Sequence, residues 1–343
     1  DGMEQIHEDL ANSIWINEGG IPDNNIDDYN KGYIDDYRGY NLAAEDESRA
    51  WGDTYNTRTH GTSVAGILGA TSNNALGIAG VAGKCKIFPL KIAPFGTQSL
   101  SYGYESIIYA AVNGFKVINC SWGIDNYSDI NQSIINFAVS RDVAIVAAAG
   151  NDGDSRLVFP AAYNGVMGVG NSWPDDVLVG NSAYGAHLDI VAPGEGTITT
   201  SNSNVYTNFG GTSGATPIVS GTLALVRALH PELTNLQAIE FLRRCTDNIE
   251  AKNPSDLQKG LIPGRINMLK AVTLNPFDKP SISLVDHEMT TDGGKETNRF
   301  AIEETIHLSL TVVNQLRSAD GFLFRLSVVS DPQQSLQVLT NEV

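Results

Sequence analysis

The chain has 343 residues, of which 42% are hydrophobic and 18% are charged, a composition that excludes general disorder and is typical of a globular protein. It carries 22 lysine and arginine residues against 39 aspartate and glutamate residues, which gives a formal net charge of −17. Such a field repels phosphate backbones and anionic bilayers, so nucleic acid is excluded as an expected partner. The longest apolar run, Val143 to Ala149, has the length of a strand and not of a membrane span.

Short apolar strands alternate with helical stretches as far as residue 275. We expect strands at Lys86–Lys91, Lys116–Cys120, Val143–Ala149, Gly165–Val169 and Leu188–Val191, and helices at Gly61–Thr71, Tyr104–Asn113, Asn131–Arg141, Ser213–His230 and Thr234–Cys245. The strands are continuous hydrophobic runs, which is typical of a parallel sheet covered on both faces. Residues 1–275 are therefore predicted to form a doubly wound α/β domain with a mostly parallel sheet, whose reactive groups gather at strand C-terminal ends and helix N-termini.

The pattern changes after residue 276. Apolar and polar residues alternate with a period of two in Thr305–Val313 and again from Phe322 to Val328. This alternation indicates half-buried antiparallel strands, so residues 276–343 are predicted to begin an all-β sandwich. Because such a sandwich takes about 100 residues, we expect it to continue beyond Val343.

The three cysteines do not suggest a disulfide framework or a zinc site. Cys85, Cys120 and Cys245 are odd in number and widely separated. We expect all three to be small buried hydrophobic residues, and they say nothing about the compartment.

Two segments in the first half of the chain carry residue types used in catalysis. His60 stands before Gly61-Thr62 and a small-residue helix, so its ring can project from a helix N-terminus, and an imidazole suits proton transfer near neutral pH. A buried strand ends at Gly150-Asn151, which places a side-chain amide at the sheet edge where an oxyanion could form. Taken alone, His60 is also explained as an ordinary loop histidine, and Gly150-Asn151 is also explained as an ordinary turn.

A third segment, Gly211-Thr212-Ser213, precedes a run of small residues. We expect Ser213 to cap the following helix, where the helix dipole favours developing negative charge, and the glycines to admit a substrate backbone. A capping serine is common, so the segment alone is not specific. The three segments in one chain are specific.

In their order and separations, these segments resemble the motifs of the subtilisin-like (subtilase) serine peptidases. The matching stretches are His60-Gly61-Thr62-Ser63-Val64-Ala65-Gly66, Ala148-Ala149-Gly150-Asn151 and Gly211-Thr212-Ser213-Gly214-Ala215-Thr216-Pro217, supported by 73–82, 119–123 and 191–194. The resemblance runs from residue 1 to about residue 272. It implies a subtilisin-like fold in a secreted peptidase of bacterial type, followed here by the predicted C-terminal β-sandwich.

The resemblance also implies roles for individual residues. Ser213 would be the nucleophile, and His60 would take its proton and pass it to the leaving amine. Asn151 and the backbone N–H of Ser213 would hold the oxyanion. No cofactor is needed for this chemistry.

Substrate contacts follow from the same resemblance. Ser121, Trp122 and Gly123 would pair with the substrate backbone as an added strand. Trp122 and Val158 fall near the walls of the primary specificity pocket of similar enzymes, which predicts a shallow pocket. Asp152 at its rim would favour a basic or neutral substrate side chain over an acidic one.

The aspartate of the triad is not evident in the sequence. The family's first strand ends in Asp-x-Gly, and in that register Gly2 is the motif glycine and Asp1 takes the variable position. The resemblance thus places the catalytic aspartate one residue before Asp1 and the first strand before residue 1, while a register slip, which would make Asp1 itself that aspartate, stays open. Asp1 itself is expected to be an acid at the substrate edge or merely exposed.

Calcium is the one metal that the resemblance suggests. Similar proteins bind it in a loop that corresponds to 72–78, where Asn74 matches a ligand, while the remaining ligands lie partly upstream. The segment 26–36 resembles a carboxylate cage of bacterial relatives, but Tyr29 and Lys31 replace an acid and an asparagine. We therefore predict a solvated acidic loop there.

The leading hypothesis is a secreted serine endopeptidase that acts on proteins or peptides and is made with an inhibitory propeptide. The main alternative is a catalytically silent binding module that keeps the fold. An unrelated α/β hydrolase is excluded, because it requires Gly-x-Ser-x-Gly with the histidine after the serine, whereas His60 precedes Ser213.

Overall fold

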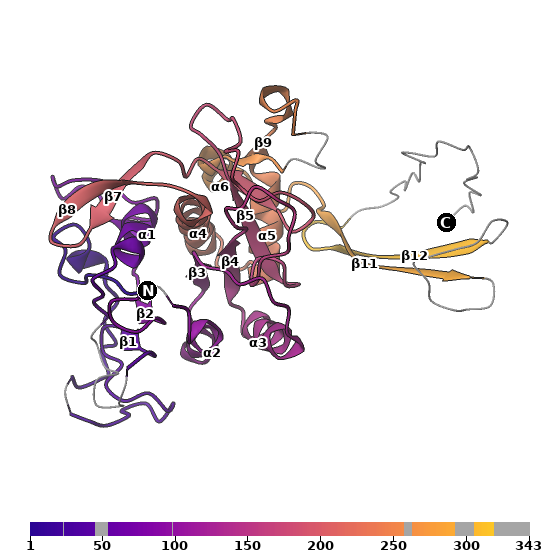
Figure 1. Cartoon of the computed structure of the whole chain (residues 1–343). Helices are drawn as coiled ribbons and strands as arrows, with labels where there is room; N and C mark the ends of the chain where they lie inside the picture. Colours follow the sequence, from indigo (N-terminus) through magenta and orange to yellow (C-terminus); the bar gives the residue numbers. More distant parts are fainter. Residues whose placement is uncertain (23, 45–53, 98, 257–262, 292–304, 319–343) are drawn as a thin grey trace. The chain divides into compact units, whose positions relative to one another are not determined.

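The computed structural model describes residues 1–22, 24–44, 54–97, 99–256, 263–291 and 305–318 (Figure 1). The chain divides into two compact units, Asp1–Asn275 and Pro276–Val343, called unit 1 and unit 2 below. Each unit is described by itself.

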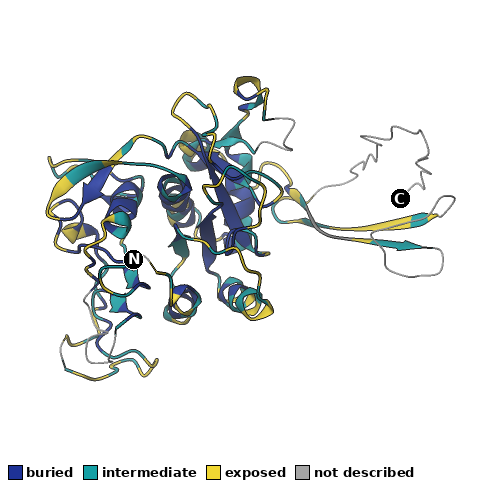
Figure 2. Cartoon of the chain, in the orientation of Figure 1, coloured by how far each residue is buried: buried dark blue, intermediate teal, exposed yellow. Residues whose placement is uncertain are grey.

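Unit 1 is built on a six-stranded sheet in the order β3-β4-β5-β6-β10-β9. The strands are β3 (Val117–Cys120), β4 (Ala144–Ala148), β5 (Val166–Asn171), β6 (Ile190–Ala192), β10 (Arg265–Ile266) and β9 (Thr246–Asp247). Neighbouring strands from β3 to β10 are parallel, and only β9 is antiparallel. β4 and β5 are buried along their whole length (Figure 2), as expected for apolar runs in a covered parallel sheet.

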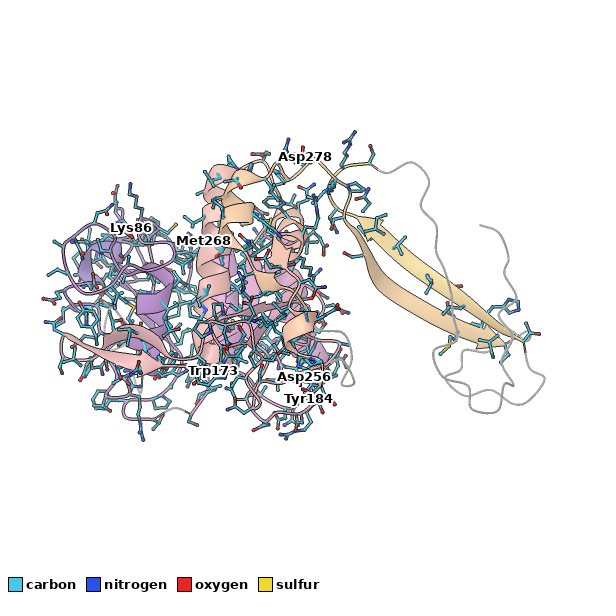
Figure 3. The ribbon with its side chains drawn as sticks, turned by 90° about the horizontal axis from the view of Figure 1, so that it is seen from above. Lys86, Trp173, Tyr184, Asp256, Met268 and Asp278 are labelled. Atoms are coloured by element: carbon cyan, nitrogen blue, oxygen red, sulfur yellow. The ribbon has the colours of Figure 1, made fainter. Side chains whose placement is uncertain are left out.

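Helices cover both faces of this sheet. α2 (Gly103–Asn113) and α3 (Asp129–Ser140) lie on one side, and α4 (Thr212–Leu229) and α5 (Asn235–Arg244) lie on the other (Figure 1). α4 is the central helix, because it contacts β3, β4, β5 and also α1 (His60–Gly69). α6 (Met268–Thr273) packs on α4, and Figure 3 labels its first residue. Within the described part of the chain, no helix is both long and apolar enough to cross a bilayer.

The five predicted helices are confirmed with ends displaced by at most two residues, but one predicted strand needs correction and one hairpin was not predicted. The strand expected at Lys86–Lys91 is reduced to β2 (Leu90–Lys91), which pairs in parallel with β1 (Tyr40–Asn41). The antiparallel hairpin of β7 (Thr197–Ser201) and β8 (Val205–Phe209) was not predicted.

Polar residues explain why the hairpin was missed. Thr199 and Thr200 are fully buried, and their hydroxyl groups donate to the carbonyls of Ser63 and Thr62 on α1 at 2.6 and 2.7 Å. Because its buried side chains are threonines that donate hydrogen bonds to helix carbonyls, this strand shows no alternation of apolar and polar residues.

An apolar groove of about 660 Å³ separates β2 from β3. Its walls come from α1, β2, α2, β3 and α4, with apolar residues that include Val64, Leu68, Phe88, Ile92, Ile118 and Ala224. Asp1 and His60 line it on the side of the α4 N-terminus, and Lys116 and Arg227 line it on the side of the α4 C-terminus. β3 is an edge strand of the six-stranded sheet, so its open edge faces this groove.

The cysteines are free thiols, and the prediction of burial is correct for two of them. Cys120 and Cys245 are buried, whereas Cys85 is half-buried and lines the groove. Burial raises the pKa of the Cys120 thiol to about 12, which makes it unreactive at neutral pH.

Unit 2 contains two antiparallel strands among its described residues, β11 (Ile282–Thr291) and β12 (Ile306–Asn314). β12 confirms the strand predicted at Thr305–Val313, while the strand predicted from Phe322 to Val328 lies outside the described residues. Leu308 and Leu310 are 39% and 42% exposed, so the described ribbon leaves this apolar face uncovered. The β-sandwich remains a prediction.

Candidate active site

Ser213 lies in the first turn of α4. The helix begins at Thr212 and its N-cap is Gly211, so the prediction that Ser213 caps the helix is wrong by two positions. Gly211 has a φ of 73°, a left-handed conformation that favours glycine, and a Cβ at this position would lie 3.1 Å from Oδ1 of Asn151. The backbone N–H of Ser213 is one of those that a helix N-terminus leaves without an intrahelical acceptor.

The Ser213 side chain is held by the segment after β3. Its hydroxyl donates to the carbonyl of Ser121 at 3.3 Å, and the Ser121 hydroxyl donates to the carbonyl of Ser213 at 3.0 Å. Among the described residues, the Ser213 hydroxyl therefore does not donate to His60. A rotation of the side chain about χ1 is needed to redirect its hydrogen.

Asn151 follows β4 at the carboxyl end of the sheet, as predicted. Gly150 turns the chain with a φ of 114°, and the Asn151 side chain is exposed beyond it. Its Oδ1 accepts hydrogen bonds from the backbone N–H of Thr212 at 2.9 Å and from the Thr212 hydroxyl at 3.1 Å. These two bonds fix the orientation of the amide, and its NH₂ group donates to no side chain or backbone carbonyl among the described residues.

His60 is the first residue of α1, and Asp1 lies next to it. Oδ1 of Asp1 is 3.4 Å from Nδ1 of His60, and the Asp1 side chain is 3% exposed. The prediction of an exposed acid is therefore wrong. The reason is close backbone packing: Met3 N donates to Thr54 O at 2.7 Å, and a Cβ on Gly61 would lie 2.0 Å from Gly2 O.

The surroundings of His60 favour the neutral imidazole. Burial lowers the pKa of His60 to about 4. The Phe209 ring, 5.3 Å away between centroids, forms part of these surroundings. His60 can therefore accept a proton at neutral pH.

Glu195 supports the turn before Ser213, a role that the sequence analysis missed. Its Oε2 accepts hydrogen bonds from the Gly211 backbone N–H at 3.0 Å and from Nδ2 of Asn171 at 2.9 Å. A Cβ on Gly210 would lie 2.6 Å from Glu195 Oε1, so the carboxylate packs directly against the loop. The sequence signal for this role was the position of Glu195 directly after Pro193-Gly194, which ends one of the supporting motif stretches.

The predicted substrate segment forms one side of the site. Ser121, Trp122 and Gly123 follow the end of β3, and Gly123 is exposed. The Trp122 indole packs where a side chain on Gly103 would lie, since a Cβ there would be 2.6 Å from the ring. It also meets Tyr104 edge-on with ring centroids 5.5 Å apart.

Asp152 is at the surface next to Asn151. Its side chain is 63% exposed and bonds to Arg156 at 2.7 Å. The same guanidinium contacts Asp154 at 2.6 Å and Asp125 at 3.3 Å, so three carboxylates surround one cation. This patch keeps a net negative charge.

The described residues do not form a calcium cage at Asn74. Its Nδ2 donates to Oδ1 of the buried Asp9 at 2.6 Å, and its Oδ1 accepts from the Leu76 N–H at 3.1 Å. The other Asp9 oxygen accepts from Ile78 N and from the Tyr206 hydroxyl. Calcium requires about 6–8 oxygen ligands, and the Asn74 amide would have to turn over to offer one. No group of three His, Cys, Asp or Glu side chains suited to a metal occurs in the described part of the chain.

The acidic segment 26–36 is only partly solvated, which corrects its prediction. Asp35 and Asp36 are each 5% exposed. Asp35 accepts hydrogen bonds from the backbone N–H groups of Asn24 and Asn25, and Asp36 accepts from the Tyr109 hydroxyl at 2.6 Å. Burial raises the pKa of Asp36. These carboxylates organise the loop.

Comparison with known proteins gives a family for this arrangement. Residues 1–260 match the Subtilase family. The chain is 36% identical over 222 residues to a thermophilic serine proteinase of Bacillus sp. strain AK1, covering 64% of this chain and 54% of that protein. It is 36% identical over 195 residues to subtilisin Savinase of Lederbergia lenta, covering 57% of this chain and 72% of that protein.

A solved structure, that of the prenylagaramide maturation protease PagA, is similar with a TM-score of 0.58 and 27% identity, covering 62% of this chain and 81% of that one. The chain spans about half the length of the first relative above. With the sheet order, the Ser213 and Asn151 geometry and the family match in agreement, the chain belongs to the Subtilase family of subtilisin-like peptidases.

Proposed function

We propose that the protein is a serine endopeptidase that hydrolyses peptide bonds through an acyl-enzyme on Ser213. The observation that carries the proposal is the pair of hydrogen bonds from Thr212 to Oδ1 of Asn151. They hold the Asn151 side chain against the residue before Ser213 by its oxygen, so that its NH₂ group is the part left to donate, as an oxyanion hole requires.

In the acylation step, the Ser213 hydroxyl turns from the Ser121 carbonyl towards His60. Its oxygen bonds to the carbonyl carbon of the substrate while its proton passes to the neutral imidazole. The negative charge that forms on the carbonyl oxygen accepts hydrogen bonds from the Asn151 amide and the Ser213 N–H. The C–N bond then breaks, and His60 gives the proton to the leaving amine. In the second half, His60 takes a proton from water as the water oxygen bonds to the ester carbon. The C–O bond to Ser213 then breaks, His60 returns the proton to the Ser213 oxygen, and the carboxylic acid product leaves.

We propose that Asp1 orients His60 during this cycle. Its carboxylate is on the Nδ1 side of the ring, at 3.4 Å, and favours the tautomer that carries hydrogen on Nδ1 and a free lone pair on Nε2. The buried Oδ2 has no hydrogen-bond partner among the described residues, so the carboxylate is poised to stabilise an imidazolium.

Substrates of the proposed enzyme are proteins or peptides bound as an added strand along Ser121, Trp122 and Gly123. Backbone pairing gives affinity with little dependence on sequence, which suits an endopeptidase. Secretion and synthesis with an inhibitory propeptide belong to the same proposal. So does a structural calcium ion near Asn74, which requires the Asn74 amide to turn over and offer its oxygen. Calcium is tested by whether a chelator lowers the melting temperature.

The groove between β2 and β3 supports the first strand that the sequence predicts before residue 1. We propose that an extended apolar segment lies in it and pairs with both strands, which would join the two sheets into one. Its lining is apolar along β2, β3 and α4, and Asp1 already stands at one end.

The thiol of Cys85 reports on this strand, because it lines the groove. A chain extended before Asp1 by about five apolar β-forming residues, a usual strand length, should label more slowly with a maleimide at Cys85 than the 343-residue chain does. The buried Cys120 and Cys245 serve as internal controls. Equal labelling of Cys85 in both chains would contradict the proposal.

The proposed activity is tested by hydrolysis of a denatured protein and of short peptide esters. An active enzyme should release ester product in a burst of about one equivalent, followed by slower turnover, because the acyl-enzyme accumulates. Ser213→Ala should abolish the burst, and Asn151→Ala should lower kcat by about 10²–10³, the loss known for subtilisin's own oxyanion-hole donor. A folded protein with no burst and no turnover would favour the silent binding module.

A further inference from the structure

We propose that Val158 restricts cleavage to peptide bonds that follow a small, uncharged residue such as glycine, alanine or serine. The inference rests on the proposed function, and it names the substrate class of that site. The residue concerned, called the acyl residue below, is the one whose carbonyl Ser213 attacks.

The geometry begins with the two backbones beside the nucleophile. Gly123 ends the substrate segment, and Gly150 precedes the oxyanion asparagine. Neither has a side chain, so the space between them is where an acyl residue placed on Ser213 and Asn151 can direct its own side chain. Gly123 is exposed, which leaves its outer edge open to a substrate strand.

Val158 already fills most of this space. Its Cγ1 would be 2.3 Å from a Cβ built on Gly123, and its Cγ2 would be 3.0 Å from a Cβ built on Gly150. Ala183 limits the space further, with its Cβ 3.6 Å from the same built position on Gly150. Val158 is only 9% exposed, so its two methyl groups are enclosed between the glycines and do not project into solvent.

The segment that carries Val158 is held in place. Ile124 and Phe159 exchange two backbone hydrogen bonds of 2.8 Å, which fix the register of Val158 against Gly123. The Phe159 ring is 4% exposed and packs on Tyr163 with ring centroids 4.5 Å apart. Because valine is also stiff at χ1, a bulky acyl side chain cannot enter without displacing this packed segment.

The charge around this space restricts the choice of acyl residue further. Asp125, Asp152 and Asp154 surround Arg156 in the residues next to this space, so the neighbourhood keeps more negative than positive charge. An acidic acyl residue is repelled by this patch, and lysine or arginine is too long for the space that Val158 leaves. Small neutral side chains remain.

The test compares peptides that differ only in the acyl residue: alanine, phenylalanine, leucine, lysine and glutamate, with kcat/KM measured for each. The protein should cleave after alanine about 10- to 100-fold faster than after phenylalanine or leucine, the usual range for a pocket that lacks room. Val158→Gly should raise the value for phenylalanine by at least about tenfold and change that for alanine by less than about threefold.

Two control variants keep the result interpretable. Leu157→Gly removes a neighbouring side chain that is 51% exposed and should leave the preference unchanged. Val158→Ala, a milder change, replaces Val158→Gly if the latter lowers the melting temperature, and it should shift the preference in the same direction.

The outcomes separate this inference from the proposed function. Cleavage after phenylalanine or leucine as fast as after alanine in the unchanged protein would overturn the role of Val158 and leave the peptidase assignment intact. The same holds if neither Val158 variant changes the preference. If no peptide is cleaved and Ser213 does not form an acyl-enzyme, the proposed function fails and this inference fails with it.

Discussion

Oδ1 of Asp1 lies 3.4 Å from Nδ1 of His60, the first residue of α1. The carboxylate is almost fully buried, and one of its oxygens has no hydrogen-bond partner among the described residues. A buried and incompletely satisfied carboxylate beside an imidazole is costly unless the imidazole becomes charged during the reaction. The Asp1 carboxylate should therefore matter for turnover.

Asp1→Asn should lower kcat by about 10⁴ with a small change in KM, because an amide favours the wrong imidazole tautomer. Steady-state kinetics with a peptide ester measure both parameters. The matched control is Glu8→Gln, which removes an exposed carboxylate of the same N-terminal segment and should have no effect. A loss of less than tenfold for Asp1→Asn would show that another carboxylate orients His60.

The activity should depend on pH through the protonation of His60. Burial lowers the pKa of His60 to about 4, below its ordinary value of 6.5. The neutral, base-competent imidazole thus persists as the pH falls from 6.5 towards 4, and kcat/KM should decline only near the lower value. A pH–rate profile of the 343-residue chain with its midpoint at 6.5 or above would contradict the expectation.

Glu195 should act as a positioning residue for the turn that presents Ser213. Glu195→Ala removes the acceptor for Gly211 N–H and Asn171, and should lower kcat roughly tenfold with little change in KM, since the turn that presents Ser213 loosens. Glu195→Gln keeps a carbonyl acceptor and should retain most of the activity. A rise in KM at unchanged kcat in Glu195→Ala would instead assign the residue to substrate binding.

The fourth prediction concerns stability. Arg227, whose side chain is 5% exposed, forms two hydrogen bonds with Asp142 at 3.0 and 2.6 Å, and the guanidinium holds the pKa of that carboxyl far below its usual range. Asp142→Asn tolerates the local φ of 65° but leaves a buried cation unpaired, so it should destabilise the fold by about 3 kcal/mol in chemical denaturation.

Lys116 supplies a matched control, because it contacts the same Asp142 carboxylate at 2.9 Å with a side chain that is 60% exposed. Lys116→Ala should cost less than about 1 kcal/mol, as exposed ion pairs do. Equal losses for the two variants would mean that burial of Arg227 does not govern the energetics of this cluster.

The parts of the fold that follow from periodicity were predictable. The helix expected at Ser213–His230 is α4 at Thr212–Leu229, and the run Val143–Ala149 contains β4, because long apolar patterns leave few alternatives. His60, Asn151 and Ser213 were identified from motifs whose local geometry is set by adjacent glycines and helix starts.

The remaining features depend on contacts between distant parts of the chain. The burial of Asp1 depends on Thr54 and Gly61, and the place of Val158 depends on pairing between Ile124 and Phe159. Glu195 meets Gly211 only in the folded chain. No local pattern encodes such contacts, so sequence reasoning could name Val158 and Asp1 but could not say what they touch.

If Ser213 is an activated nucleophile, it should react covalently with a fluorophosphonate. We expect one label per folded molecule on Ser213, identified by peptide mass spectrometry, with none in Ser213→Ala and much slower labelling in His60→Ala. Folded protein that stays unlabelled at Ser213, or that labels equally in Ser213→Ala, would contradict the account.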